Sequence, residues 1–514
     1  MGTHRRDHRY DGGDSFWQLV DRAARAWPDR VLAVDERDRE LTFAEYAAGA
    51  ERLAAGLYQH GVRSGEVVSW MLPTWLEAAL LIAALDRLGV VQNPMLPIYR
   101  EREVGFITRQ AKTTLMITPS VWRRYDYASL ARTAVDNVLV IDRDAALPDA
   151  DPAVLPAFVS DPDRIAWLFY TSGTTADPKG VKHRHGSVAA STVSMSFRMQ
   201  IDERDRAALA FPIAHIGGVN WLLAGLLTGC RVILIENFAD PTTMAALQRH
   251  GVTLAGVTTV FHLAYLAAQR ANPNERLFPD VRAFPGGAAP KPPQLHYDLI
   301  EEVGGVGIVA GFGLTEYPMC GMAAVTDPSD KLAHTEGRPS DGTEFVVLDE
   351  TGRRVGPNTD GEIRIKGPHL FVGYVDPALD VEGFDEHGFF KTGDLGHLDE
   401  DGYVVITGRL KDVINRKGEN ISAKEIEDLV YTHPKVADVA VIGLPDADAG
   451  ERVCAVVACA PGVEPLTFDE MIAYLGDQKL ITRKLPQQLE LVPELPRNAA
   501  GKVQKHALRE RYGP

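Results

Sequence analysis

Five short clusters of polar residues could bind a phosphorylated ligand and act on it. The first is Tyr170-Thr-Ser-Gly-Thr-Thr-Ala-Asp-Pro-Lys-Gly180, in which hydroxyls alternate with glycine and Lys179 stands near the end. Glycine lets backbone N–H groups converge on one point, and converging amides, hydroxyls and a cation form a cradle for phosphate. Most Ser/Thr/Gly clusters are only solvated connectors. This one lies between a strand-like run, residues 165–169, and a helical run, residues 187–199, which favours a binding loop.

Two familiar nucleotide-binding patterns do not fit this chain. The order Lys179-Gly180-Val181 differs from the Walker loop, in which Gly-Lys precedes Ser or Thr. A P-loop nucleotide hydrolase is therefore disfavoured. Gly305-x-Gly307-x-x-x-Gly311 has the wrong spacing for a dinucleotide fingerprint, and its glycines fall within an expected strand around residues 306–310.

The second and third clusters offer carboxylates. Gly311-Phe-Gly-Leu-Thr-Glu-Tyr317 follows a buried strand. At the carboxyl end of a parallel strand, Glu316 could hold a cation that bridges phosphates. Alone, Glu316 would more often be an acid at a helix start. In Lys391-Thr-Gly-Asp394 the aspartate could accept both hydroxyls of a ribose, although an Asp in a turn usually caps its own backbone.

The fourth and fifth clusters carry cations. Thr407-Gly-Arg-Leu-Lys-Asp412 lies at an expected domain boundary. Leu495-Pro-Arg-Asn-Ala-Ala-Gly-Lys502 lies near the C-terminus. A lone Lys after Gly is most often a solvated turn residue. Their meaning therefore depends on the elements that would bring the five clusters together.

Strand-like runs alternate with helical runs through the first two thirds of the chain, which predicts a mainly parallel sheet covered by helices. A helix is expected from Ser15 to Trp27, and two capping-box patterns, Thr42 with Glu45 and Thr74 with Glu77, mark two more helix starts. The expected strands are residues 67–71, 114–118, 138–141, 165–169, 207–211, 231–235 and 306–310.

The sequence thus predicts an α/β protein built from two domains. Residues 1–409 form a large N-terminal domain of parallel or mixed sheets with helices, and its last part, about 337–409, is a small β-rich subdomain. Residues 410–411 are an expected hinge. Residues 412–514 form a small α+β domain, with a helix near 423–432 and strands at 436–442 and 453–460. A small domain on a short charged hinge is a candidate mobile lid.

Composition argues against several classes of protein. A chain of 514 residues is too long for one core, and 45% hydrophobic with 24% charged residues is typical of a soluble globular protein. A net charge of −16 argues against binding to nucleic acid or to anionic membranes. The best candidate membrane segment, Leu76 to Leu85, is too short, and the N-terminus lacks the apolar core of a secretory signal. The cysteines, at positions 230, 320, 454 and 459, have no zinc-type spacing. We therefore expect a cytoplasmic protein without an integral membrane segment.

Together, the five clusters occur in the order and approximate spacing of the adenylate-forming superfamily, which comprises acyl-CoA synthetases, peptide-synthetase adenylation domains and firefly-type luciferases. The resemblance runs from about Trp17 to the end of the chain. It implies two half-reactions. A carboxylate first attacks the α-phosphate of Mg·ATP to give an acyl-adenylate and pyrophosphate, and a thiol then takes the acyl group. The segment Gln92 to Glu103 is similar to bacterial ligases for alicyclic and medium- or long-chain aliphatic acids.

The resemblance also implies roles for the matching residues in nucleotide binding. Phe312 would stack on adenine, Thr315 would contact the α-phosphate, and Glu316 would hold Mg²⁺. Asp394, assisted by Arg409, would bind the ribose hydroxyls. The β- and γ-phosphates would be held by Thr171, Ser172, Gly173, Thr174, Thr175 and Lys179. The other expected nucleotide-binding positions are Gly287, Ala288, Ala289, Gly311 and Gly313.

Lys502 matches the catalytic lysine of the superfamily, whose cation would lie where charge builds between the carboxylate and the α-phosphate. Lys411 matches the hinge about which the lid turns. Rotation would bring in Arg416-Lys-Gly-Glu-Asn-Ile421, including Gly418, to line the tunnel for the pantetheine arm of coenzyme A. ATP, Mg²⁺ and coenzyme A are therefore the expected cofactors.

The expected acyl pocket lies near Phe211-Pro-Ile-Ala-His215. Amino-acid-activating relatives place an Asp there, and this chain has none, so an amino-acid substrate is disfavoured. His215 with Gly217 and Gly218 is similar to the acyl-CoA synthetase pattern, although a packed His at a strand end is the simpler interpretation. Gly287 and Gly313 complete the expected pocket, and His215 joins Thr315, Glu316 and Lys502 in the expected catalytic set. A bulky neutral acid, aliphatic or cyclic, is the predicted substrate.

Three positions depart from the superfamily pattern. Ala176 replaces a commoner Gly, Phe312 a commoner Tyr, and Arg184 a small residue often Thr. Ala176 and Arg184 leave open a ligase proficient only in the thioester-forming half-reaction. The sequence is also compatible with a stand-alone adenylation enzyme that loads a carrier protein, and with a catalytically inactive nucleotide-binding protein. A homodimer is compatible with this class, and no nucleic-acid partner is expected.

Overall fold

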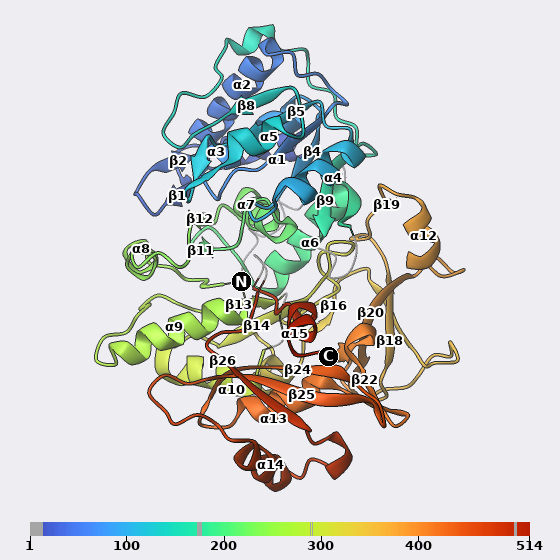
Figure 1. Cartoon of the computed structure of the whole chain (residues 1–514). Helices are drawn as coiled ribbons and strands as arrows, with labels where there is room; N and C mark the ends of the chain where they lie inside the picture. The colour runs from blue at the N-terminus through green and yellow to red at the C-terminus, as the bar shows by residue number, and fades with distance from the viewer. Residues whose placement is uncertain are drawn as a thin grey trace.

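The computed structural model describes residues 14–171, 177–256, 258–287, 289, 291–497 and 501–513. Within these ranges the chain is an α/β protein with several mixed sheets, as the sequence predicts. Figure 1 shows the N-terminal strands and helices at one end of the molecule and the C-terminal residues at the other. The β-rich part, in orange, lies beside the two.

The largest sheet has seven strands. Its order is β19 (Gly373–Tyr374), β10 (Lys179–Arg184), β9 (Ile165–Thr171), β4 (Val91–Pro94), β3 (Val67–Trp70), β5 (Leu115–Thr118) and β8 (Val138–Val140). The strands from β9 to β8 run parallel, whereas β10 and β19 are antiparallel additions at one edge. The expected parallel sheet is therefore present with a mixed edge.

The connection after β9 differs from the sequence expectation. Lys179 pairs with Thr171 in an antiparallel register, so the phosphate-loop segment joins two strands, and α6 (His185–Arg198) begins only after β10. The predicted direct strand-to-helix connection is wrong. The six residues of β10 carry four basic side chains, which hide their strand character, yet Val181 and His183 are buried.

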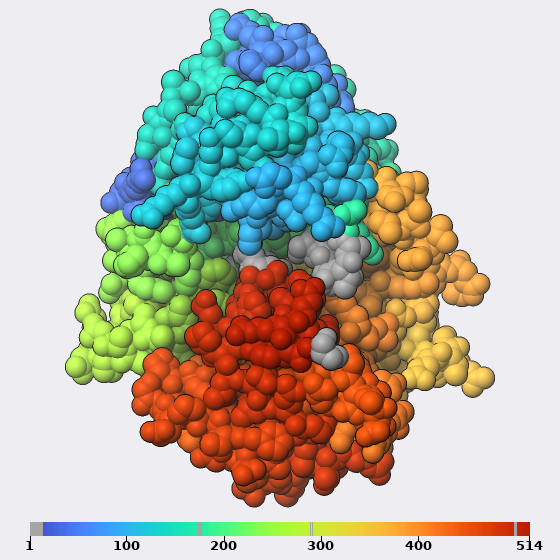
Figure 2. All heavy atoms as spheres, in the orientation of Figure 1, coloured from blue at the N-terminus to red at the C-terminus, as the bar shows by residue number. Residues whose placement is uncertain are grey.

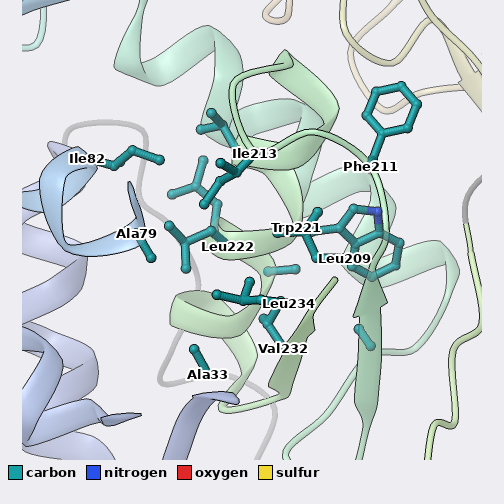
Figure 3. Packing of buried hydrophobic residues seen from close by; sticks show 14 of the residues in the cluster. Ala33, Ala79, Ile82, Leu209, Phe211, Ile213, Trp221, Leu222, Val232 and Leu234 are labelled. Atoms are coloured by element: carbon teal, nitrogen blue, oxygen red, sulfur yellow. The ribbon is translucent and has the colours of Figure 1, made fainter. Parts of the chain in front are cut away.

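A four-stranded sheet supports α7 (Ile216–Thr228). Its order is β11 (Arg206–Leu209), β12 (Arg231–Leu234), β1 (Val31–Asp35) and β2 (Glu40–Thr42). Figure 3 shows Leu222 of α7 packed among Leu234, Val232 and Ala33 of this sheet. Because α7 is apolar on nearly all sides, this packing fixes its N-terminus.

The third sheet brings two glycine-rich segments together. It consists of β13 (Phe284–Gly287), β14 (Ile308–Phe312), β15 (Gly321–Met322) and β16 (Arg338–Pro339), with Gly287 opposite Gly311. The sequence places a strand at residues 306–310, but Gly305 and Gly307 have φ of +69° and +79°. These left-handed conformations are incompatible with a strand, so β14 starts at Ile308 and ends on Phe312.

The predicted helix starts have different outcomes. Thr42 accepts a hydrogen bond from Glu45 N and Glu45 accepts one from Thr42 N, which confirms the capping box of α2 (Phe43–Gln59). The second predicted box is wrong. The Thr74 hydroxyl instead accepts a hydrogen bond from Ile213 N, and Trp75 precedes α3 (Leu76–Arg87) without a side-chain cap. A tertiary contact thus takes the place of the local cap.

The β-rich part is an antiparallel sheet of β17 (Glu344–Leu348), β18 (Gly361–Lys366), β20 (Phe390–Leu398) and β21 (Val404–Arg409). Residues from 414 onward form core clusters of their own. Their sheet contains β22 (Ile414–Arg416), β23 (Glu419–Ile421), β24 (Val436–Asp446), β25 (Gly450–Cys459) and β26 (Gln488–Val492). The helices are α13 (Ala423–Tyr431), α14 (Phe468–Asp477) and α15 (Lys505–Tyr512). Figure 2 shows the last, red part of the chain reaching up against the N-terminal part.

The remaining elements complete the N-terminal domain. The helices are α1 (Phe16–Ala26), α4 (Glu101–Ala111), α5 (Tyr127–Arg132), α8 (Thr243–Arg249), α9 (Thr259–Ala271), α10 (Pro293–Asp298), α11 (Ser329–His334) and α12 (Ala378–Gly383). The short strands β6 (Val121–Trp122) and β7 (Tyr125–Asp126) form a hairpin. Among the described helices, none combines the length and the apolar character needed to cross a membrane.

Candidate active site

A cavity of about 1340 Å³ lies between the N-terminal part and the C-terminal domain. It takes lining residues from strand ends of the large domain, from the β-rich sheet and from the C-terminal segment. The predicted site residues that line it are Thr171, Lys179, His215, Ala289, Gly311, Phe312, Gly313, Thr315, Glu316, Asp394, Arg409, Lys411 and Lys502. Ser172, Gly173, Thr174, Thr175 and Ala288 lie outside the described residues, as does Ala176. The tertiary structure therefore brings all five sequence clusters to one cavity.

Asp394 carries a buried oxygen suited to a ribose. Its side chain is 2% exposed on β20, and its Oδ1 lies 2.8 Å from Arg409 Nε on the neighbouring β21. Its Oδ2 is buried without a hydrogen-bond partner among the described residues. Burial raises the pKa of Asp394, and the cations of Arg409 and Lys502 oppose that rise. A buried acceptor requires a partner, so this atom fits a nucleoside hydroxyl.

Lys502 reaches the large domain from the C-terminal segment. Burial, together with the cations of Arg409 and Lys411, lowers its pKa to about 8, and the carboxylates of Asp394 and Glu316 oppose that shift. Lys502 lines the same cavity as the two acids. Gly501 allows this segment to lie close to Thr258 of the large domain, since a Cβ at position 501 would lie 3.1 Å from Thr258 Oγ1.

His215 is the N-cap of α7, and its Nδ1 accepts a hydrogen bond from Gly217 N at 3.0 Å. Its ring meets the ring of Phe211 edge-on at 4.5 Å between centroids. Burial, with a contribution from the Lys502 cation, lowers its pKa to about 3. His215 therefore lines the cavity as a neutral imidazole.

Glu316 is buried at the cavity wall and is held at two points. Tyr374 Oη donates to Glu316 Oε1 at 2.8 Å, and Phe371 N donates to the Glu316 carbonyl at 2.9 Å. No group of three His, Cys, Asp or Glu side chains within the described ranges could hold a metal by itself. Mg²⁺ commonly binds through one or two carboxylates with substrate phosphates and water. Glu316 fits that donor set.

The loop after β14 depends on a glycine and on a buried histidine. A Cβ at Gly313 would lie 2.1 Å from the Pro318 carbonyl oxygen, so only glycine fits there. His183 Nε2 bonds the Thr315 carbonyl oxygen at 2.8 Å, and burial lowers the His183 pKa to about 4. Phe312 is largely buried in the same cluster as Tyr317.

Four predicted residues do not line the cavity. A Cβ at Gly218 would lie 2.3 Å from the Pro212 carbonyl oxygen, and one at Gly287 would lie 2.8 Å from the Gly311 carbonyl oxygen. Both glycines therefore serve the close approach of backbone segments. Gly217 supplies the N–H that His215 accepts. Gly418 has φ of +79° in the turn between β22 and β23.

Arg184 faces away from the cavity. Its side chain is 47% exposed, and its Nε donates to the Asp163 carbonyl oxygen at 3.2 Å and lies 3.4 Å from Asp163 Oδ1. The structure therefore places this departure from the superfamily pattern at the surface.

Sequence reasoning missed two residues that hold the site. Tyr374 and His183 contact Glu316 and Thr315 from strands β19 and β10. A single Gly-Tyr pair and a His in a basic run gave no periodic or spacing signal.

Comparison with known proteins bears directly on this site. The sequence model described as AMP-binding enzyme matches residues 20–375, and the one described as AMP-binding enzyme C-terminal domain matches residues 425–502. The chain belongs to the AMP-binding enzyme family. The predicted adenylate-forming superfamily, the predicted α/β fold and the use of ATP are thereby confirmed.

Several relatives of this AMP-binding enzyme cover nearly its whole length. The medium-chain fatty-acid–CoA ligase of Escherichia coli (strain K12) is 29% identical, with 96% of this chain and 89% of that protein aligned. The salicyl-AMP ligase / salicyl-S-ArCP synthetase of Mycobacterium tuberculosis is 31% identical, with 98% and 92% aligned. The ATP-bound crystal structure of MatB from Rhodopseudomonas palustris superposes with a TM-score of 0.87 at 29% identity, covering 96% and 99%. At the level of the family, the expectation of an AMP-forming acyl-CoA synthetase is confirmed.

Proposed function

We propose that this AMP-binding enzyme is an acid:CoA ligase that activates a hydrophobic carboxylic acid through its acyl-adenylate. The observation that carries the proposal is the meeting of Lys502, Glu316 and Asp394 in one cavity although they come from three separate parts of the chain. A carboxylate is a poor acyl donor until its oxygen becomes a good leaving group. Joining it to AMP supplies that leaving group.

Lys502 is the group proposed to act on the reacting atoms. Negative charge builds between the substrate carboxylate and the α-phosphate during attack, and a preorganised cation stabilises it most in a site from which water is excluded. With a pKa of about 8, Lys502 is mainly protonated at neutral pH. It therefore supplies positive charge without a change of protonation.

The other residues orient the nucleotide. Asp394 Oδ2 accepts from the ribose, while Arg409 holds the other oxygen of that carboxylate. Glu316 would hold Mg²⁺, and Lys179, which lines the same cavity at the start of β10, would act on the phosphates. When bound, Mg²⁺ neutralises part of the triphosphate charge. Fixing the α-phosphate against the acid turns a bimolecular encounter into a reaction within one complex.

The wall near His215 favours an acid without a second charge. Lys502 is the cation beside His215, whose own lowered pKa keeps it neutral. A second carboxylate or an ammonium group would lose its hydration beside the uncharged lining residues that flank His215 in the chain. The flanking residues are Ala214 and Ile216, and Thr259, Ala289 and Pro292 are further uncharged residues of the cavity lining. An aliphatic or cyclic neutral acid fits this wall better than an amino acid or a dicarboxylate.

Coenzyme A is the proposed thiol, and a carrier protein is the second candidate. Relatives of both kinds support weighing the two. The Escherichia coli relative is a CoA ligase, and the Mycobacterium tuberculosis relative is a salicyl-S-ArCP synthetase.

A panel of acids tests the proposal. Pyrophosphate release should be greatest with medium-chain and alicyclic acids and weak with acetate, malonate and amino acids. Acetate or an amino acid as the best substrate would contradict the pocket argument. Binding of ATP without pyrophosphate release for any acid would favour a catalytically inactive nucleotide-binding protein.

The thiol and the two half-reactions are tested next. The acyl-adenylate formed from the best acid is offered to coenzyme A and to carrier proteins, and the thioester is quantified by mass spectrometry. Faster transfer to a carrier protein would contradict the choice of coenzyme A. Efficient transfer from a supplied acyl-adenylate together with negligible pyrophosphate release would show a chain proficient only in the second step.

A further inference from the structure

The segment from Phe371 to Val375 joins β10 to the loop after β14. Val372 N donates to the Lys182 carbonyl at 2.8 Å, and Val375 N donates to the Gly180 carbonyl at 2.7 Å. The segment therefore pairs with β10, the strand that begins with Lys179. Phe371 N donates to the Glu316 carbonyl, so the same short segment also holds the loop after β14.

Tyr374 is the fourth residue of this segment. Its side chain is buried, and its Oη donates to Glu316 Oε1 at 2.8 Å. The Lys179 ammonium lies over its ring, 5.5 Å from the centroid. One side chain thus contacts both the carboxylate suited to Mg²⁺ and the lysine of the phosphate loop.

The chemistry of a phenol suits both contacts. The phenol hydroxyl donates its hydrogen bond to the Glu316 carboxylate. A hydrogen bond to a charged group is stronger than one between neutral groups, and it fixes one oxygen of Glu316 while the other is left for a ligand. The negative face of the ring attracts an ammonium group. Lys179 is exposed, and the Tyr374 ring offers its ammonium group a preferred position.

We infer that Tyr374 is a positioning residue for the pyrophosphate side of the site: its hydroxyl orients Glu316 toward the metal, and its ring orients Lys179 toward the phosphates. Tyr374, on the edge strand β19 of the seven-stranded sheet, thereby orients two groups of the site at once. The inference rests on the proposed function for the Mg·ATP site itself.

Tyr374→Phe isolates the role of the hydroxyl. We expect the affinity for ATP with Mg²⁺, measured by isothermal titration calorimetry, to fall by about tenfold or more, as loss of a hydrogen bond to a charged group predicts. Affinity for ATP in EDTA and for AMP should stay within twofold, because neither depends on a metal held by Glu316. The matched control is Tyr46→Phe, which removes another buried hydroxyl, one that donates to the Ala79 carbonyl at 2.8 Å far from the cavity.

Tyr374→Leu isolates the role of the ring. It should also weaken ATP binding in EDTA, because Lys179 acts on the phosphates directly, while AMP binding is retained. A second readout is the thioester step with a supplied acyl-adenylate, which uses neither group and should proceed at the wild-type rate in both variants.

The outcomes are distinct. Wild-type affinity of Tyr374→Phe for Mg·ATP, or an equal loss for AMP, would overturn the inference and leave the proposed function standing. A similar loss in Tyr46→Phe would reduce the effect to general destabilisation and would also overturn it. Failure of the wild-type protein to bind Mg·ATP would instead count against the proposed function.

Discussion

Arg409 Nε lies 2.8 Å from Asp394 Oδ1 across the antiparallel pair of β21 and β20. The guanidinium compensates one oxygen of a carboxylate that is almost fully buried, and the other oxygen has no partner among the described residues. Burial of an uncompensated polar atom is unfavourable. Arg409 therefore stabilises the Asp394 carboxylate, and Oδ2 remains to accept a hydrogen bond from a bound hydroxyl.

Replacing Asp394 with Asn tests this relationship. The amide keeps the shape but loses the charge, so we expect the KM for ATP to rise by about tenfold to a hundredfold. Steady-state kinetics with varied ATP measures it. The control is Asp399→Asn. Asp399 follows the same strand, lies outside the cavity lining and forms an ion pair with Lys331 at 2.7 Å. An unchanged KM in Asp394→Asn would contradict ribose binding at this position.

Lys502→Ala should separate the half-reactions. Loss of a preorganised charge typically lowers the rate by about 10²- to 10³-fold, and we expect that loss in pyrophosphate release. Transfer of the acyl group from a supplied acyl-adenylate to coenzyme A should persist, because lid rotation is proposed to carry this lysine away. Lys435→Ala, which removes a cation paired with Glu470 in the same domain, is the control. Equal impairment of both steps would refute the assignment.

The rate of adenylation should fall as the pH rises through about 8. Lys502 acts as a cation, and its lowered pKa of about 8 means that the cation is lost above that pH. The plot of kcat/KM for the acid against pH should therefore show a descending limb near pH 8. Lys502→Arg should be slower but without this limb, since arginine stays protonated. An unchanged limb in that variant would assign it to another group.

Buried neutral histidines should make the fold sensitive to acid. Burial lowers the pKa values of His183, His262 and His369 to about 4. The unfolded chain binds protons at these groups below about pH 6.5, so stability is full above 6.5 and falls toward pH 4, by on the order of 3 kcal/mol per histidine.

Thermal unfolding between pH 7 and pH 5 measures this loss. We expect His183→Gln, whose amide can still donate to the Thr315 carbonyl, to show a shallower fall of Tm with pH than the wild type. His387→Gln, at an exposed position, should leave the slope unchanged. Identical slopes in all three proteins would show that His183 does not contribute.

Arg184→Thr should leave ATP use unchanged. Its side chain contacts Asp163 at the surface, so the KM for ATP should stay within twofold of the wild-type value. A marked improvement would mean that this cation does disturb the phosphate loop, contrary to its position.

Much of this protein was predictable from the sequence because the relevant signals are local. Gly313 is a glycine because the Pro318 carbonyl lies too close for a Cβ. Hydrophobic periodicity indicates the strands and helices that position the five clusters. The order of those clusters along the chain sufficed for the family. Such signals act over a few residues, so they survive without knowledge of the fold.

Only the tertiary structure decided which side chains meet. Thr74 lies in a capping-box pattern, yet its hydroxyl accepts from Ile213 N, over a hundred positions away in the chain. β10 becomes a strand because it pairs with β9 and β19, and this pairing brings Tyr374 to Glu316 and His183 to Thr315. Contacts of this kind depend on packing between distant elements. Residue type and spacing along the chain do not reveal such contacts. The sequence therefore identifies the residues of the site, and the tertiary structure determines which side chains hold them in place.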